Sequence, residues 1–242
     1  MGVVAAVVEA TGESPWYAGL GVLSFVLSTL VAGRWVRRAD AGPRGQDLAI
    51  IWFAALGGAF LGAKLAFLVA EGLAERTTLA GLIGGRSIAG ALLGGYGSVE
   101  LAKRLVGWRR PTGDLFAVTV PLSLTIGRVG CVLADCCQGI ACEGTWFTVL
   151  DHDGTPRWPA AQVELLFNAA FLAWAVWAGR RGWQRDQRFH VYLIAYGLFR
   201  FGHEFLRDDP RWFGAFGGYH AVALALVALG AWRHRVRAAG LG

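Results

Sequence analysis

The sequence predicts an all-α protein that crosses a membrane seven times, with the amino terminus outside and the carboxyl terminus in the cytoplasm. The 242 residues are 55% hydrophobic, and the mean hydropathy is +0.45. A soluble domain of this length carries more charge and fewer long apolar runs. The 35 glycines follow no repeat period, which argues against a collagen-like chain and favours close packing of helices in a bilayer.

Seven apolar runs are candidates for membrane-spanning helices, since most of them approach the ~20 residues that a bilayer requires. They cover residues 17–33, 48–69, 87–101, 115–133, 160–178, 191–206 and 219–232. The third run is short and glycine-rich, and an apolar, glycine-rich segment at residues 79–85 precedes it, as in a re-entrant segment. We expect a single membrane domain over residues 1–242, with a small extracytoplasmic cap at residues 135–158.

Lys and Arg are distributed unequally between alternate connections, and this asymmetry determines the predicted orientation. One set of connections carries Arg34, Arg37, Arg38, Arg44, Lys103, Arg104, Arg109, Arg110, Arg180, Arg181, Arg185, Arg188, Arg233, Arg235 and Arg237. The opposite set carries Arg76, Arg157, Arg207 and Arg211 among many acidic residues. We place the first set in the cytoplasm, so the net charge of +6 is a topology signal rather than a nucleic-acid patch. The first fourteen residues lack the basic region of a secretory signal, and we expect the first run to remain as an anchor.

Four basic side chains lie inside the apolar runs or directly next to one, where each charge in a span costs from ~2.5 kcal/mol upward. They are Lys64, Arg86, Arg128 and Arg200. Arg200 and Glu204 are one helical turn apart, so an internal salt bridge that fixes helix register is one interpretation. One acid does not neutralise four basic centres, however. The excess of cations favours an anionic lipid headgroup, because the arginine fork donates two parallel hydrogen bonds to phosphate.

Four cysteines follow Arg128 at the outer end of the fourth run: Cys131, Cys136, Cys137 and Cys142. Metal ligation is one interpretation, although the spacing lacks the usual C-x2-C pair. A disulfide between Cys142 and Cys136 or Cys137 is a second, because the outside compartment is oxidising. Inert packing is a third, strongest for Cys131. A redox or acyl-carrying thiol is a fourth, but no cysteine has a clear base beside it.

Six motifs between Tyr17 and Pro210 occur in the order known from one enzyme family. They read SPWYAGL, AFLGAKLAFLV, GGRSIAGALLGG, GRVGCVLADCCQG, PRWPAAQVELLFN and YLIAYGLFRFGHEFLRDDP. They resemble the motifs of prolipoprotein diacylglyceryl transferases, including the G-R-[IVL]-G signature and the Y-G-x-x-R-x-x-x-E-x-x-R helix. These two motifs together make the resemblance specific.

The resemblance implies a multi-pass enzyme of the bacterial inner membrane with seven spans. Such an enzyme transfers the diacylglyceryl group of phosphatidylglycerol to a lipobox cysteine thiol of a preprolipoprotein. A thioether forms and glycerol phosphate leaves. The implied partners are phosphatidylglycerol, the preprolipoprotein or another thiol acceptor, and the lipid bilayer. No metal, organic cofactor or nucleic acid is implied.

Candidate site residues follow from the positions that match the motifs. The catalytic set comprises Arg128, Arg200, Glu204 and Tyr17. Arg128 and Arg200 would stabilise the charge that develops on the leaving phosphate, and Glu204 would hold Arg200. The substrate-binding set comprises Lys64, Arg86, Gly139, Gln162 and Glu164. The attacking thiol belongs to the acceptor and must be ionised.

Three positions depart from the family motifs. Ala89 stands where many members have a histidine, Trp158 replaces the histidine of R-H-P, and Cys131 replaces a common asparagine. A general base is therefore not evident, and His203 and His152 are the candidate substitutes. Alternative functions are a paralogue that uses the same lipid but another acceptor, a non-catalytic lipid-binding or transport protein, and a thiol-redox membrane protein.

Overall fold

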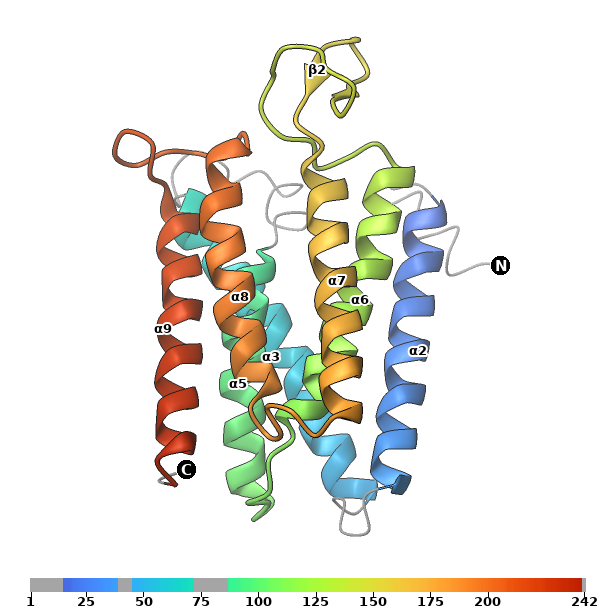
Figure 1. Ribbon diagram of the computed structural model, residues 1–242, viewed down its shortest axis with the longest axis vertical. Helices are drawn as coiled ribbons and strands as arrows, with labels where there is room; N and C mark the ends of the chain where they lie inside the picture. Colours follow the sequence, from blue (N-terminus) through green and yellow to red (C-terminus); the bar gives the residue numbers. More distant parts are fainter. Residues whose placement is uncertain (1–14, 39–44, 72–86, 241–242) are drawn as a thin grey trace. The chain divides into compact units, whose positions relative to one another are not determined.

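The computed structural model describes residues 15–38, 45–71 and 87–240, which are mostly helical (Figure 1). The helices are α2 (Pro15–Arg38), α3 (Gly45–Glu71), α5 (Ile88–Leu105), α6 (Gly113–Leu133), α7 (Ala160–Arg180), α8 (Arg188–His203) and α9 (Gly218–Ala238). A short 3₁₀ turn, η1 (Glu204–Leu206), follows α8, and two strands, β1 (Val149–Leu150) and β2 (Pro156–Arg157), lie between α6 and α7. Each of the seven apolar runs coincides with one helix. The segment at residues 79–85 lies outside the described residues.

In the part of the chain that the structure describes, three helical segments are long and apolar enough to cross a bilayer by length and composition: Gln46–Glu71, Gly113–Leu133 and Ala160–Arg180. On α3, the side chains of Phe53, Phe60, Leu61 and Leu65 are each exposed by 59% or more. An exposed face of this size is unusual in a water-soluble monomer and fits contact with lipid. The structure is therefore consistent with an all-α membrane protein. The number of crossings and the sides of the termini stay predictions.

Contacts between elements divide the chain into two compact units, each described here by itself. The first unit contains α2, α6, α7, the strands and residues 206–208. The second contains α3, α5, α8 and α9. The expectation of a single domain stays a prediction.

Polar side chains join α2 to α6 in the first unit. Ser28 Oγ lies 2.7 Å from Ser123 Oγ, and Ser24 donates to the carbonyl of Ser123 at 3.3 Å. Ser24 and Ser28 are both buried. Hydrogen bonds between small polar residues are a common adhesive between helices that lack a hydrophobic driving force in lipid.

Glycines join α3 to α5 in the second unit. A Cβ on Gly62 would lie 2.3 Å from the carbonyl oxygen of Gly90, and one on Gly94 would lie 2.2 Å from the carbonyl oxygen of Gly58. The two backbones are therefore in direct contact, as in small-residue interfaces of membrane helices. Ser87 begins α5 by accepting a hydrogen bond from the backbone N–H of Gly90 at 3.3 Å. The glycine content noted in the sequence thus serves helix packing.

Residues 134–159 of the first unit form a loop that projects beyond the ends of α6 and α7 (Figure 1). β1 and β2 pair antiparallel, with Val149 opposite Arg157. Arg157 Nε donates to Asp151 at 2.6 Å, and the Arg157 Nη1 donates to the carbonyl of Gly139 at 3.2 Å. The loop occupies the residues expected to form a cap, and the side of the membrane on which it lies stays a prediction.

Candidate functional site

Arg128, on the last turns of α6, forms a buried ion pair across to α7. Its Nη2 lies 2.7 Å from Glu164 Oε2, and Glu164 has no exposed surface. The backbone carbonyl of Glu164 accepts a hydrogen bond from the Asn168 side chain at 2.9 Å. Removing one partner of a buried pair leaves an uncompensated charge. Glu164 thus lies within ion-pair distance of Arg128. Its expected role in binding substrate stays a prediction.

Gly139 is enclosed by the protein's own backbone. Its N–H donates to the carbonyl of Trp158 at 2.9 Å, and a Cβ at this position would lie 2.4 Å from the carbonyl oxygen of Leu206. The neighbouring Ile140 N–H donates to that same oxygen at 3.1 Å. A side chain at this position would therefore overlap Leu206 and Trp158. A role of Gly139 toward substrate stays a prediction.

Arg200, near the end of α8 in the second unit, lies among three charged residues. Its Nη2 is 2.8 Å from Glu204 Oε2 and 3.7 Å from Asp209 Oδ2. Arg211 Nη2 donates to the backbone carbonyl of Glu204 at 2.9 Å. The two cations and two anions balance. Arg200 Nη1 is buried and has no acceptor among the residues that the structure describes, so it retains donor capacity for a ligand.

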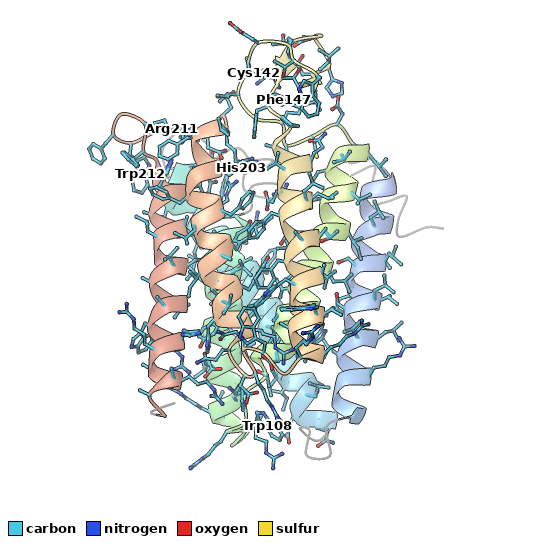
Figure 2. All side chains as sticks on the ribbon, in the orientation of Figure 1. Trp108, Cys142, Phe147, His203, Arg211 and Trp212 are labelled. Atoms are coloured by element: carbon cyan, nitrogen blue, oxygen red, sulfur yellow. The ribbon has the colours of Figure 1, made fainter. Side chains whose placement is uncertain are left out.

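The segment after Arg211 is tied to the end of α3. Trp212 Nε1 donates to the carbonyl of Ala70 at 3.0 Å, and the Tyr219 hydroxyl donates to Glu71 at 3.1 Å. A Cβ on Gly218 would lie 2.4 Å from Ala70 Cα. Figure 2 shows Arg211, Trp212 and His203 at the same end of this unit. These contacts hold the segment that follows Arg211 against the end of α3.

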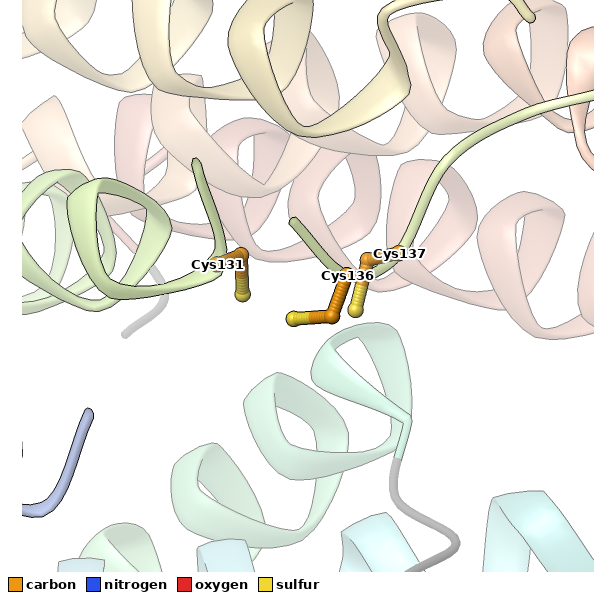
Figure 3. Close-up of side chains that lie close together, drawn as sticks. All are labelled: Cys131, Cys136 and Cys137. Carbon is orange, nitrogen blue, oxygen red and sulfur yellow. The ribbon is translucent and has the colours of Figure 1, made fainter. Parts of the chain in front are cut away.

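Three thiols converge at the end of α6 (Figure 3). The Sγ atoms of Cys131, Cys136 and Cys137 all lie within 4.8 Å of one another. The end of the helix explains this proximity. The Cys136 N–H donates to the carbonyl of Cys131 at 3.0 Å, and the Asp135 N–H donates to that of Val132 at 3.3 Å. This is the Schellman motif, in which the residues that carry Cys131 and Cys136 are brought together.

Two residues of this turn adopt left-handed backbone conformations without being glycine. Asp135 has φ of 50° and Cys137 has φ of 61°. Each such residue costs of the order of 1 kcal/mol or more, and strain of this kind gathers at functional sites. The Asp135 side chain is held by Gln138, whose Nε2 donates to it at 2.6 Å. The turn that delivers Cys137 to the other two cysteines is therefore strained.

The two thiols beyond the helix have pKa values shifted in opposite directions. Hydrogen bonds shared with Cys131 and Cys137 raise the pKa of Cys136. Hydrogen bonds from Cys131 and Cys136 lower the pKa of Cys137, and the positive charges of Arg128 and Arg207 act in the same direction.

Cys142 lies apart from this cluster. None of the four cysteines forms a disulfide. The N–H of Cys142 donates to the carbonyl of Pro156 at 2.9 Å, and Figure 2 shows Cys142 in the projecting loop. The structure therefore differs from the interpretation in which Cys142 forms a disulfide with Cys136 or Cys137, since these two thiols lie beside Cys131 instead.

For the other predicted site residues, the structure gives a location in a helix or a degree of burial but no contact that indicates a role. Lys64 is half-buried on α3, and Gln162 is half-buried in the first turn of α7. Tyr17 lies in the first turn of α2, whose side-chain positions there are outside the described part of the structure. Arg86 is outside the described residues. Ala89, at the position of the family histidine, is 1% exposed in the first turn of α5.

The histidines considered as bases are in contrasting surroundings. His203 is buried and stacks on Phe199 with ring centroids 5.0 Å apart. The side chain of His152 is 82% exposed, and its Nδ1 is 3.9 Å from Asp135. His220, which the sequence did not single out, is buried against Phe205, and its Nδ1 accepts from the Gly217 N–H at 3.0 Å. That bond leaves the proton on Nε2, so Nε2 of the neutral ring is not a proton acceptor.

The predicted site residues omit three charged residues that follow α8, although one of them, Arg207, is the last position of the Y-G-x-x-R-x-x-x-E-x-x-R motif. Asp209 and Arg211 border Arg200 and Glu204, and Arg207 contributes to the field at Cys137. The signal was present in the sequence RDDPR at residues 207–211, which adds charges directly after a helix already marked by Arg200 and Glu204. Arg207 and Arg211 entered the prediction only as part of the charge asymmetry between connections.

Comparison with known proteins agrees with the motifs. A family model described as prolipoprotein diacylglyceryl transferase matches residues 7–234. The phosphatidylglycerol–prolipoprotein diacylglyceryl transferase 2 of Clostridium perfringens is 30% identical over 130 residues, which are 51% of this chain and 51% of that protein. The corresponding enzyme of Clostridium tetani is 31% identical over 163 residues, with 64% of this chain and 66% of the relative covered.

A third relative is matched over more of its length. The phosphatidylglycerol–prolipoprotein diacylglyceryl transferase of Geobacter sulfurreducens is 29% identical over 218 residues, which are 85% of this chain and 82% of that protein. The alignments to the two Clostridium proteins span half and just under two thirds of those relatives.

Proposed function

The chain belongs to the prolipoprotein diacylglyceryl transferase family, and we propose that it transfers the diacylglyceryl group of phosphatidylglycerol to a cysteine thiol of a prolipoprotein. The observation that carries this proposal is the family match over residues 7–234, within which both buried arginines fall on motif positions. The names of the bacterial relatives include both substrates, phosphatidylglycerol and prolipoprotein. The apolar helices support a location in a membrane, and we propose the bacterial inner membrane with seven crossings.

The reaction is a displacement at a glycerol carbon. The acceptor sulfur forms a bond to that carbon, the bond from the carbon to the phosphate oxygen breaks, and glycerol phosphate leaves with the electron pair. Negative charge develops on the phosphate oxygens, where preorganised arginine donors are most effective. We assign this role to Arg128 and Arg200, with Glu164 and Glu204 as the carboxylates that hold them.

The remaining predicted residues have positioning roles in this proposal. Tyr17, Lys64, Arg86 and Gln162 would orient the headgroup by hydrogen bonds and charge. Gly139 would keep the loop close to Trp158 and Leu206 and so fix the start of α7. Asp209 and Arg211 would complete the charge balance around Arg200.

A second candidate function is the same transfer to a different acceptor. Ala89 and Trp158 stand where the family motifs have histidines. Alanine and tryptophan side chains do not accept a proton from the acceptor. The acceptor thiol must therefore be ionised by another group. The lipid half of the reaction is unaffected, because it depends on the arginines.

The test is turnover by the purified protein. Phosphatidylglycerol and a lipobox peptide should yield a diacylglyceryl thioether on the peptide cysteine together with glycerol phosphate, both detected by mass spectrometry. A peptide with serine in place of the cysteine is the control. Release of glycerol phosphate without modified peptide would select another acceptor, and absence of release with every thiol would overturn the transferase proposal.

The proposed topology has its own test. A reporter that works only in the cytoplasm should be active when it is fused after Gly242. A reporter that works only outside should be active when it is fused before α2. Both expectations follow from the unequal Lys and Arg content of the connections. A carboxyl-terminal reporter found outside would contradict the seven-span topology.

A further inference from the structure

The three thiols at the end of α6 have the arrangement of a metal site, and nothing in the reaction described above uses them. We propose that Cys131, Cys136 and Cys137 bind one zinc ion as thiolates, and that the fourth position of the zinc takes the thiol of the acceptor. The first part stands on the geometry alone. The second part rests on the proposed function.

The distances fit zinc after a small adjustment. Zn–S bonds are about 2.3 Å long, so ligand sulfurs of a tetrahedral site lie ~3.8 Å apart. The three Sγ atoms already lie within 4.8 Å of one another, so closing the remaining gap takes a shift of about 1 Å. Cys137 is exposed while Cys131 is buried, so an ion reaches the cluster from the loop side.

The local sequence explains how an unusual spacing makes a site. Zinc sites commonly use C-x2-C pairs, whereas here four residues separate Cys131 from Cys136. The Schellman turn at Asp135 brings these two together, and the left-handed conformation of Cys137 turns the third sulfur toward them. A disulfide would use only two of the three converging thiols, and a metal ion uses all three.

The surroundings suit a negatively charged metal–thiolate group. Three thiolates and one Zn²⁺ carry a net charge of −1. Arg128 Nη1 donates to Cys131 Sγ at 3.6 Å, while its Nη2 bonds to Glu164. A ligand sulfur oriented by a hydrogen bond from a fixed donor is typical of the outer shell of metal sites. Thiolates select soft ions such as Zn²⁺ and Cu⁺.

The number of ligands favours zinc over other soft metal ions. Zinc is almost always four-coordinate, and catalytic sites keep one position open for substrate or water. Among residues 15–38, 45–71 and 87–240, no fourth Cys, His, Asp or Glu joins the group. A site of three thiolates with an open position accommodates a further sulfur ligand.

An acceptor thiol bound there would be ionised without a histidine. The thiol binds zinc as thiolate and its proton goes to water. The sulfur lone pair then forms the bond to the glycerol carbon, and the electron pair of the broken carbon–oxygen bond leaves with the phosphate. The thioether product is neutral and a weak ligand, so it dissociates. This step supplies the activation that Ala89 and Trp158 do not provide.

The first experiment measures metal content, independent of turnover. The full-length protein is purified in detergent, stripped with chelator, reloaded with zinc and measured by plasma mass spectrometry. Wild type and Cys142→Ser should bind about one zinc per chain, since Cys142 lies outside the cluster. Cys131→Ser, Cys136→Ser and Cys137→Ser should bind none above background. After loading with cobalt, only wild type and Cys142→Ser should show a thiolate-to-cobalt charge-transfer band. Because Cys137 is exposed, Cys137→Ser should melt like Cys142→Ser without metal, which separates loss of the site from misfolding.

Each outcome has one meaning. Zinc retained by Cys137→Ser, or no uptake by wild type with all four thiols reduced, would overturn the site. Uptake of Cu⁺ with no uptake of Zn²⁺ would overturn the assignment to zinc. Undiminished transfer to the lipobox peptide by fully stripped protein would overturn thiol activation. If the protein binds zinc as expected but releases no glycerol phosphate from phosphatidylglycerol, the proposed function is wrong and the zinc site is still supported.

Discussion

The two buried arginines, Arg128 and Arg200, are neutralised in different ways. Arg128 pairs with Glu164 on another helix, 36 residues along the chain, and Glu164 is its acid at 2.7 Å. Arg200 pairs with Glu204 one turn further along, and Asp209 lies at 3.7 Å as a second acid. The first pair joins two helices, whereas the second orients a side chain within one segment. Loss of an acid should therefore have unequal consequences at the two sites.

The largest expected effect is on stability at the first site. Glu164→Gln removes the carboxylate that lies 2.7 Å from the buried Arg128, and breaking a buried pair costs about 3–5 kcal/mol. Glu204→Gln should cost less, because Asp209 remains near Arg200. Thermal unfolding of the two purified variants in detergent measures the difference. Equal losses would show that the cross-helix pair is no more important than the local one.

The next effect is on turnover at the same two sites. Arg128→Lys should slow transfer from phosphatidylglycerol about a hundredfold, or ~3 kcal/mol of transition-state stabilisation, because lysine keeps the charge but loses the planar fork. Arg200→Lys should behave alike, and the double variant should lose less than the sum if the two act as a unit. Melting temperatures of all variants accompany the kinetics. Wild-type turnover by a well-folded Arg128→Ala variant would remove the catalytic role.

A smaller effect concerns how the two units pack their helices. The first unit uses serine hydrogen bonds between α2 and α6, and the second uses glycine contacts between α3 and α5. Gly62→Ala should destabilise the protein by ~1–3 kcal/mol, because its Cβ would overlap the Gly90 carbonyl. Gly97→Ala on α5 is the matched control, since a Cβ there meets nothing within 4 Å. If both variants melt at one temperature, the glycine contact is not what holds these helices.

The smallest effect lies in the projecting loop and depends on pH. The hydrogen bond from Arg157 lowers the pKa of Asp151. A carboxyl with a lowered pKa contributes stability that is present above its usual value, near 4, and is lost as the pH falls through the lowered value. Wild type should therefore melt slightly higher than Asp151→Asn at neutral pH, and the difference should vanish in acid. Asp153→Asn is the control and should show little change at either pH.

The sequence predicted the helices well, and it predicted local pairs better than distant ones. Apolar runs located all seven described helices within a few residues. The spacing of Arg200 and Glu204 predicted that they share a face, and they form an ion pair. The run at residues 191–206 was too long as an α-helix, because the backbone tightens into η1 at Glu204, as last turns often do.

The Arg128–Glu164 pair and the cysteine cluster could not be predicted from the sequence, because they depend on where a helix ends and on what packs beside it. Nothing in the spacing of Arg128 and Glu164 connects them until α6 and α7 lie side by side. The cysteine spacing looked unsuitable for a metal only while the end of α6 was unknown. Once Asp135 adopts a left-handed conformation, the same spacing brings Cys131 and Cys136 together.

The contact between α3 and α5 reverses the usual relation between side-chain size and tolerance to substitution. In a water-soluble core the large apolar residues are the most sensitive, since truncation leaves a cavity. On α3 the large residues Phe53, Phe60 and Leu65 point away from the protein, and lipid fills any space that they vacate. Gly58 and Gly62 admit no side chain at all. Sequence drift among distant relatives should therefore alter the largest residues of this helix first and its smallest residues last.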